Sequence, residues 1–290
     1  MTSPLPTRSR TRLGVLTDCH LAAPGTPDAR FNNPVLLSQS RKLLTDALSW
    51  LTGQVDALVL LGDLAQSATP DDYDYLFAQM AATKLPIYLV PGNHDFPPDS
   101  PHPAAALRSP SNGALVPPPT GISFGTATLT SGDLTAEPEG FRLLVDGNLP
   151  ASTPLVWLSH FPVLSLESTV HDQNLRYAGD LLNRAEVERT LQERRGPVVA
   201  LTGHLHVRGH AIANSVLQLN MGPLVESPHD ASVVTIDVHG NQITVDRATH
   251  RLADGDNATI FDPEHTTFDW DGTSWRALSR RTEHQRDGNS

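Results

Sequence analysis

Ile87-Tyr88-Leu89-Val90-Pro91-Gly92-Asn93-His94-Asp95 is the stretch that decides the fold, because an apolar run passes directly into a turn bearing polar side chains. The apolar run predicts a buried strand, and Gly92 permits a sharp turn after it. Sites in open α/β sheets lie beyond the carboxyl ends of the strands. The stretch therefore predicts a strand that delivers an amide, an imidazole and a carboxylate to a site.

Four other stretches repeat this arrangement elsewhere in the chain. Each places His or Asp just after an apolar run, and they are Asp18-Cys19-His20, Gly62-Asp63, Ser159-His160 and Gly203-His204-Leu205-His206. Few structural needs place so many polar residues beside buried strands. Oxygen and imidazole ligands that arrive from several strand ends can converge on one point, so the pattern predicts a metalloenzyme.

The N-terminal half alternates strands and helices. The predicted strands cover residues 13–16, 57–61 and 87–90. One predicted helix covers residues 35–52, and a second begins with Thr69 as N-cap and Pro70 in its first turn. A β-α-β-α-β order predicts parallel strands with helices packed on the sheet.

The C-terminal half ends in antiparallel pairs. Short strands are expected near 122–129, 141–146, 154–159 and 198–201, with a helix from Asn183 to about Arg195. Gly240-Asn241 and Asp271-Gly272 each separate two apolar stretches, which predicts two hairpins between about 230 and 279. Residues 96–121 are rich in Pro and small residues and predict an irregular loop. We expect a disordered start over 1–11, one domain over 12–279, and a disordered tail over 280–290.

The composition restricts the class of partner and the compartment. The chain has 290 residues, a net charge of −11 and one cysteine. No basic run occurs beyond a short Arg-bearing N-terminus, so nucleic acid is an unexpected partner. The N-terminus lacks the apolar stretch of a signal peptide, and no segment has the length of a membrane span. With no intrachain disulfide possible, these features predict a cytoplasmic protein without membrane contact.

The ordered set of motifs over residues 18–206 resembles the calcineurin-like metallophosphoesterase superfamily. That superfamily carries D-x-H, G-D, G-N-H-D/E, a lone His after a strand, and G-H-x-H, and all five stand here in that order. The resemblance is nearest to the bacterial cyclic-nucleotide phosphodiesterase-like branch. It implies a four-layer α/β/β/α sandwich with two mixed β-sheets.

The resemblance also implies a dinuclear metal centre. One metal would be held by Asp18, His20, Asp63 and His206. The other would be held by Asp63, Asn93, His160 and His204, with Asp63 bridging the two ions. Mixed imidazole, carboxylate and amide ligands suit two divalent or trivalent ions of Mn, Fe, Zn or Co. On an extended backbone, His204 and His206 would share one face.

Three further residues take supporting roles by the same resemblance. His94 is expected to contact the phosphate and protonate the leaving oxygen, because imidazole exchanges protons near neutral pH. Asp95 is expected to brace its loop by hydrogen bonds. Many relatives carry a carboxylate where this chain has Gln66, and a glutamine would orient His94 while stabilising an imidazolium less well.

The implied function is a phosphoesterase in which metal-bound hydroxide attacks a small phosphodiester, of the cyclic-nucleotide or glycerophosphodiester type. A phosphomonoesterase, a protein phosphatase or a nucleotide pyrophosphatase is the alternative, and a non-catalytic scaffold of the same fold is a third. Specificity is expected to lie in the loops 96–121 and 161–180. Whether the C-terminal hairpins form a homodimer contact is left open.

Overall fold

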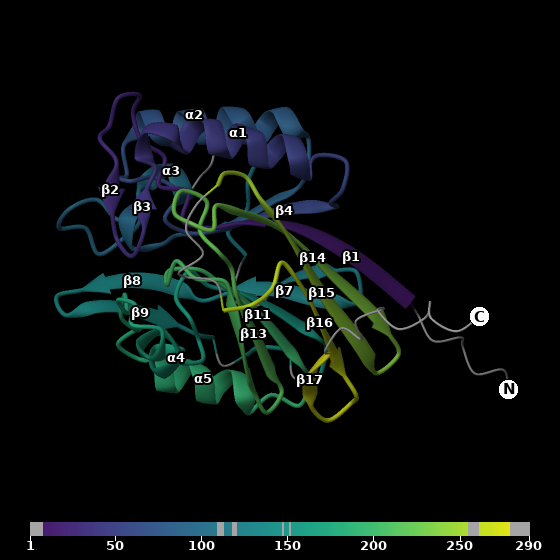
Figure 1. Ribbon diagram of the computed structural model, residues 1–290. Helices are drawn as coiled ribbons and strands as arrows, with labels where there is room; N and C mark the ends of the chain where they lie inside the picture. Colours follow the sequence, from purple (N-terminus) through teal and green to yellow (C-terminus); the bar gives the residue numbers. More distant parts are fainter. Residues whose placement is uncertain are drawn as a thin grey trace, which may run out of the picture.

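The protein is a sandwich of four layers (Figure 1). The computed structural model describes residues 8–108, 113–117, 121–146, 148–150, 152–254 and 261–278. Two mixed β-sheets lie face to face in the middle, and helices cover the outer face of each sheet. The predicted α/β/β/α architecture is therefore confirmed.

The first sheet has seven strands. In sheet order they are β17 (Trp275–Leu278), β16 (His265–Trp270), β15 (Gln242–Arg251), β14 (Asp230–His239), β1 (Arg8–Leu16), β4 (Ala57–Leu61) and β5 (Ile87–Val90). β1, β4 and β5 are parallel, as the alternation of strands and helices predicted. The pairs from β14 to β17 are antiparallel, which confirms both C-terminal hairpins.

The second sheet has six strands. In sheet order they are β12 (Gly209–Ala213), β13 (Val216–Asn220), β11 (Val198–Thr202), β10 (Leu155–Leu158), β7 (Ala127–Ser131) and β6 (Ile122–Phe124). The four strands from β13 to β7 are parallel, and both edge pairs are antiparallel. The β12–β13 pair was not predicted, because the small residues of β12 carry little β-propensity.

The helices lie in two groups. α1 (Ser40–Leu51) and α2 (Pro70–Thr83) cover the first sheet, and α4 (Glu167–Asp172) and α5 (Arg184–Gln192) lie on the side of the second (Figure 1). The remaining short elements are α3 (Ala105–Arg108), two 3₁₀ turns (Leu37–Gln39 and Asn93–Asp95), and the ribbons β2 (Ala29–Arg30) with β3 (Pro34–Val35) and β8 (Asp133–Glu137) with β9 (Gly140–Leu144). Among the described residues, no helix combines the length and the apolarity that crossing a membrane requires.

Two predicted elements differ from the structure. The helix expected over 35–52 begins only at Ser40, because Pro34 and Val35 pair with β2 and a 3₁₀ turn follows them. The disorder expected over residues 1–11 is wrong for residues 8–11, which extend β1 along the long strand β14. Arg8 also forms a 2.7 Å ion pair with Asp237. Residues 1–7 and the expected tail 280–290 lie outside the described residues.

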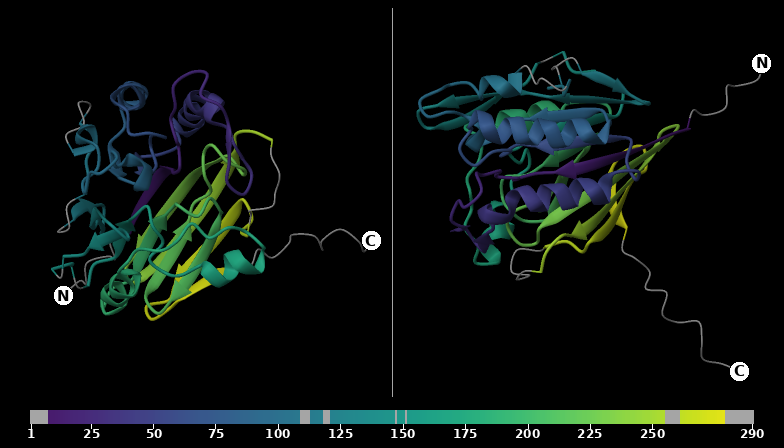
Figure 2. Two further views of the ribbon diagram at one scale, coloured as in Figure 1. Left: turned by 90° about the vertical axis from the view of Figure 1, so that its left-hand side faces the viewer. Right: turned by 90° about the horizontal axis from the view of Figure 1, so that it is seen from above.

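Alternating side chains of the buried strands fill separate cores. Leu58 and Leu60 pack under α1 and α2, whereas Val59 and Leu61 meet Leu158 and Leu201 of the second sheet. Burial on both faces explains why these strands are continuous apolar runs. Because both layers are fixed in this way, the loops after β1, β4, β5, β10 and β11 emerge at one edge, which faces the viewer in the left view of Figure 2.

Candidate metal centre

Two buried aspartates lie at the middle of this edge, each beside imidazoles. Asp63 Oδ2 is 3.6 Å from His20 Nε2 and 3.4 Å from His160 Nε2. Asp18 Oδ1 is 3.4 Å from His206 Nε2 and 4.0 Å from His160 Nε2. Residues from four separate loops, as far apart in the chain as 18 and 206, thus meet within a side chain's reach.

The other predicted site residues join the same cluster. Asn93 Oδ1 and His204 Nδ1 each lie 3.2 Å from His160 Nε2. The ring of His94 stands edge-on to that of His20, with 4.7 Å between the ring centroids. A cavity of about 290 Å³ exposes His20, Asp63, Asn93, His94, His204 and His206 together. The structure therefore brings together every residue that the sequence assigned to the metals, and His94 with them.

The donor set fits metal ions. Three groups have ligand atoms that all lie within 4.8 Å of one another, and they are Asp18 with His20 and His206, His20 with Asp63 and His94, and Asp18 with Asp63 and His160. Asp18 Oδ1, His20 Nε2 and His204 Nε2 are buried and have no hydrogen-bond partner among the described residues. Buried polar atoms without partners are costly, and cation coordination would satisfy them.

The electrostatics favour positive charge in this cluster. Burial opposes ionisation of Asp63, but His160 and His20 lower the pKa of its carboxyl well below the ordinary value. Burial also opposes protonation of His160, yet Asp63 and Asp18 raise its pKa to about 9. Two close carboxylates thus attract protons to neighbouring imidazoles, and bound cations would provide the same compensation.

Two of the candidate metal ligands, His20 and His204, are neutral imidazoles. Burial lowers the pKa of His20 to about 4, and burial together with His160 lowers the pKa of His204 to about 3. A neutral imidazole keeps a nitrogen lone pair, which is the form that binds metals. His160 differs in protonation but is also oriented for metal binding, because its Nδ1 donates to the carbonyl of Leu61 at 2.7 Å and leaves Nε2 toward Asp63, where a bound cation would replace the proton.

The site loops are strained. Five site residues other than glycine have positive φ angles, and they are Asp18, His20, Asp63, His204 and His206. Such conformations cost on the order of 1–3 kcal/mol each and concentrate at functional sites. The expectation that His204 and His206 share a face on an extended backbone is wrong, because their φ angles are 70° and 55°. The two rings instead reach His160 and Asp18 from a tight turn.

Gly92 lets two of these loops touch. A Cβ atom there would lie 2.3 Å from both the backbone nitrogen and Oδ1 of Asp63. The backbone N–H of His94 donates to that same Oδ1 at 2.8 Å. Any larger side chain at Gly92 would push the Asp63 carboxylate out of position.

Asp95 braces the loops by hydrogen bonds, in the position that the sequence suggested. Its carboxylate accepts hydrogen bonds from the N–H groups of Gly92, Leu64 and Ala65 and from the hydroxyl of Tyr73. These contacts join the loop after β5 to the loop after β4. Such a carboxylate fixes the positions of Asp63 and Asn93 relative to each other.

Gln66 supports His94 in a different way from the one expected. Its backbone carbonyl, rather than its side-chain amide, lies 3.0 Å from His94 Nδ1. A backbone carbonyl can orient the ring whatever side chain position 66 carries. The Gln66 carbonyl therefore orients the His94 ring as a carboxylate would, but it does not supply the negative charge that would stabilise an imidazolium.

Glu226 is a site residue that the sequence analysis missed. Its Oε2 atom accepts a 2.6 Å hydrogen bond from His206 Nδ1, and its side chain is fully buried. Carboxylates that hold the distal nitrogen of a ligating histidine fix its orientation and raise its basicity. No motif surrounds this glutamate, so nothing in the sequence separates it from a surface residue.

Substitution of Glu226 by glutamine is expected to lower the affinity for Mn²⁺ by about tenfold to a hundredfold, because an amide keeps the shape but removes the charge behind His206. Isothermal titration calorimetry of metal-free protein measures this. Glu193, which is exposed at the end of α5, provides the matched control in Glu193→Gln. An unchanged Mn²⁺ affinity in Glu226→Gln would show that the Glu226 contact does not tune His206.

The wall of the cavity comes partly from an unexpected segment. Ala29, Arg30, Phe31 and Val35 of the β2–β3 hairpin line it, with Ala178 from the expected loop 161–180. Among the described residues of 96–121, none lines the cavity. The sequence analysis assigned no element to residues 29–34 and placed Val35 at the start of a helix, because only the folded chain shows that this segment turns back over the site.

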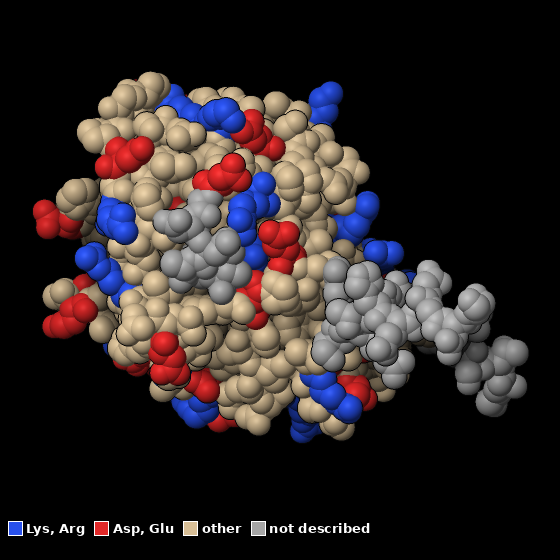
Figure 3. Space-filling model, viewed as in Figure 1, with Lys and Arg blue, Asp and Glu red and all other residues tan. Residues whose placement is uncertain are grey.

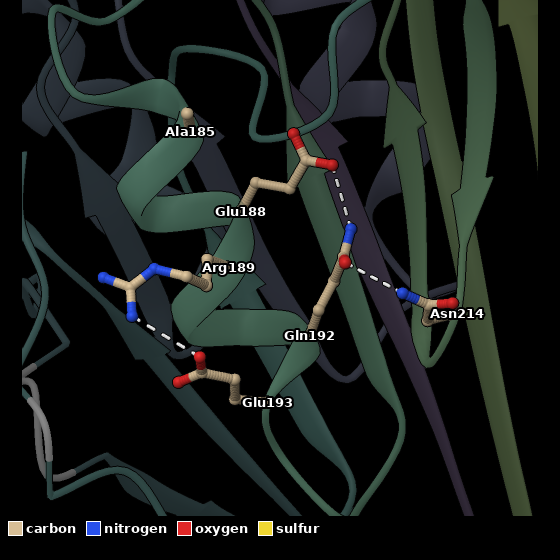
Figure 4. Close-up of a pocket in the computed structure, with 6 residues that line it drawn as sticks. All are labelled: Ala185, Glu188, Arg189, Gln192, Glu193 and Asn214. Carbon is tan, nitrogen blue, oxygen red and sulfur yellow. Dashed lines mark hydrogen bonds and ion pairs between the residues drawn. The ribbon is translucent and has the colours of Figure 1, made fainter.

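A second depression lies beside α5 (Figure 4). Its polar side chains are paired with one another, since Gln192 donates to Glu188 at 2.9 Å and accepts from Asn214 at 2.8 Å. Arg189 likewise pairs with Glu193. These mutual bonds leave the strand-end cavity as the better candidate for ligand binding.

Comparison with known proteins gives relatives at low identity. The chain is 27% identical over 198 residues to the 3′,5′-cyclic adenosine monophosphate phosphodiesterase CpdA of Escherichia coli K12, covering 62% of this chain and 66% of that protein. It is 31% identical over 84 residues to a probable cyclic nucleotide phosphodiesterase of Fibrobacter succinogenes, covering 29% and 30%. The matches thus span less than two thirds of these relatives' own lengths.

Solved structures share the fold. A dimetal phosphatase from Danio rerio superposes with a TM-score of 0.61 at 15% identity, covering 84% of this chain and 98% of that one. The family model described as calcineurin-like phosphoesterase matches residues 11–208, a stretch that contains all five motifs but not Glu226. The chain therefore belongs to the calcineurin-like phosphoesterase family.

Proposed function

We propose that the protein is a dinuclear-metal phosphodiesterase that hydrolyses a small phosphodiester. The observation that carries this proposal is the position of Asp63, whose Oδ2 atom lies between His20 and His160 while Oδ1 is held by the N–H of His94. A carboxylate can bridge two cations, whereas a neutral imidazole cannot. Asp63 is therefore the residue around which two ligand sets are arranged.

In this proposal Asp18, His20 and His206 complete one ligand set, and Asn93, His160 and His204 complete the other. When bound, a pair of ions such as Mn, Fe, Zn or Co supplies Lewis acidity toward phosphoryl oxygens and lowers the pKa of a bound water. Hydrogen bonds within the protein hold these ligand atoms in position before any ion binds. The hydroxyl of Thr17 and the N–H of His204 both donate hydrogen bonds to Asp18 Oδ2. The other oxygen, Oδ1, is thereby left available to bind a cation.

His94 is proposed as the group that contacts the phosphate and protonates the leaving oxygen. Its ring lines the cavity beside His20. Because Nδ1 is engaged by the carbonyl of Gln66, the remaining nitrogen Nε2 is the one available to hold or release the proton. Proton transfer from a positioned histidine is a common source of catalytic acceleration.

A small diester is favoured over other substrates for two reasons. The relatives named as cyclic nucleotide phosphodiesterases support diester chemistry. The net charge of −11 suits a small ligand better than a nucleic-acid backbone, and on the face drawn in Figure 3, which is turned by 90° from the site edge, Lys and Arg side chains are likewise interspersed with Asp and Glu. A non-catalytic scaffold is disfavoured because every ligand position is filled by a donor.

Metal removal followed by a substrate comparison tests the function. Chelation is expected to lower turnover of 3′,5′-cyclic AMP or a glycerophosphodiester by at least about a hundredfold, and Mn²⁺ is expected to restore it. Turnover of each diester should exceed that of its monoester product, measured by release of alcohol or phosphate. Equal or faster monoester turnover would instead establish a phosphomonoesterase.

A further inference from the structure

The cavity has two chemically different parts. Its floor consists of the donor residues and Gln66, whereas its wall consists of Ala29, Arg30, Phe31, Val35 and Ala178. The floor suits a phosphate. The wall offers apolar surface with one aromatic ring and one cation, and this part must contact whatever the phosphate carries.

Phe31 is fixed at the junction of floor and wall. Its ring stands edge-on to the ring of His206, with 5.4 Å between the centroids, and its other contacts are with the core under α1. The edge-on geometry is a favourable one for two rings. A ring held in this way is a preorganised surface that binds a ligand without losing much rotational freedom.

The hairpin that carries Phe31 is held from two sides. Glu226 Oε1 accepts hydrogen bonds from the N–H groups of Asn32 at 3.0 Å and Asn33 at 2.5 Å. Asn32 Oδ1 in turn accepts from the N–H of Arg176 in the loop 161–180. Because Glu226 also holds His206, one buried carboxylate sets the distance between the metal ligands and the aromatic wall.

The chemistry of the wall indicates what lies against it. A glycerol moiety would need hydrogen-bond partners for its hydroxyl groups, and Arg30 is the only polar side chain among the five wall residues. A flat heteroaromatic ring needs an apolar or aromatic surface instead, and a guanidinium group can stack on it or bond its edge. Arg30 is exposed and lies beside Phe31 in the chain, so it can reach such a ring.

We propose that the β2–β3 hairpin recognises a nucleobase, with Phe31 stacking against the base and Arg30 providing a cationic contact. The substrate class is then a nucleoside phosphodiester rather than a glycerophosphodiester. This inference rests on the phosphodiesterase function proposed above for the choice of diester. The recognition itself can be tested without turnover, because a nucleoside monophosphate would occupy the same floor and wall.

The experiment compares two ligands and three variants on the Mn²⁺-loaded protein. Affinities for 5′-AMP and glycerol 3-phosphate are measured by calorimetry, and kcat/KM is measured for 3′,5′-cyclic AMP and glycerophosphoethanolamine. Phe31→Ala is expected to weaken the adenosine ligand and substrate by about tenfold to a hundredfold, the range of one lost base stack. The glycerol compounds should change less than about threefold, and Arg30→Gln should act in the same direction more weakly.

Phe124→Ala provides the matched control, because Phe124 is a half-buried aromatic residue on β6, packed on Tyr88 away from the cavity. It should leave the preference for adenosine over glycerol unchanged. Equal binding of 5′-AMP and glycerol 3-phosphate by the unmodified protein would overturn the inference. So would a parallel loss for both ligands in Phe31→Ala, which would mean that Phe31 only supports His206.

The two proposals can fail separately. If neither diester is hydrolysed but 5′-AMP binds more tightly and Phe31→Ala removes that preference, the hairpin recognises a base and the phosphodiesterase function is wrong. If both diesters are hydrolysed and Phe31→Ala leaves the adenosine preference intact, the function holds and the role of the hairpin is wrong.

Discussion

Asp63→Asn is expected to abolish binding of the metal pair and to lower phosphodiester turnover by at least about a thousandfold, since metal ions contribute several kcal/mol to such reactions. The amide keeps the size of the side chain and one carbonyl oxygen. It loses the charge that faces His20 and His160 and the ability to bridge two cations. The backbone of Gly92 lies so close to Asp63 that even an added Cβ atom would clash with the carboxylate, which leaves little room for the residue 63 side chain to move.

The loss of metal can be measured apart from activity. Mn²⁺ at a hundred times its dissociation constant stabilises a protein by about 2.7 kcal/mol, so the unmodified protein should melt at a higher temperature with Mn²⁺. Asp63→Asn should lose most of that increase. Asp46→Asn on the exposed face of α1 is the matched control and should keep it. Full Mn²⁺ stoichiometry in Asp63→Asn would contradict the bridging role.

The site could be predicted from the sequence because each motif directly follows a strand that is buried on both faces. Such a strand is a continuous apolar run, so its end is easy to locate in the sequence. Residues 57–61 and 87–90 were placed correctly for this reason, and Asp63 and His94 followed from them. The same logic placed His160, which alone would read as an ordinary structural histidine.

Other features depended on contacts that no local pattern encodes. Glu226 reaches His206 and the hairpin at Asn32 across 20 and 194 residues of chain. The hairpin itself has only two residues in each strand, too few for alternation to show. The positive φ angles of the site loops arise from the packing of one loop against another, as at Gly92 and Asp63. Long-range packing therefore decides the support and the wall of the site.

His94→Ala is expected to keep the metal content while turnover of a natural diester falls by about a hundredfold to ten-thousandfold, the usual range for a lost general acid. The loss should depend on the leaving group. A nitrophenyl diester releases a stable anion that needs no proton, so its turnover should fall much less. Metal analysis and kcat for the two classes of substrate measure this, and His102→Ala, at an exposed position, serves as control.

The metal content must be measured as well, because the geometry also allows His94 to act as a metal ligand. Its ligand atom lies within 4.8 Å of those of His20 and Asp63, so the ring is close enough to share a cation with them. The hydrogen bond between Nδ1 and the carbonyl of Gln66 fixes the ring in either case. If metal content and turnover fell together, and nitrophenyl and natural diesters lost activity equally, His94 would be a ligand and the source of the leaving-group proton would have to lie elsewhere. Retained metal with a loss confined to poor leaving groups assigns the proton to Nε2 of His94, because a structural or ligating histidine would not distinguish the two substrates.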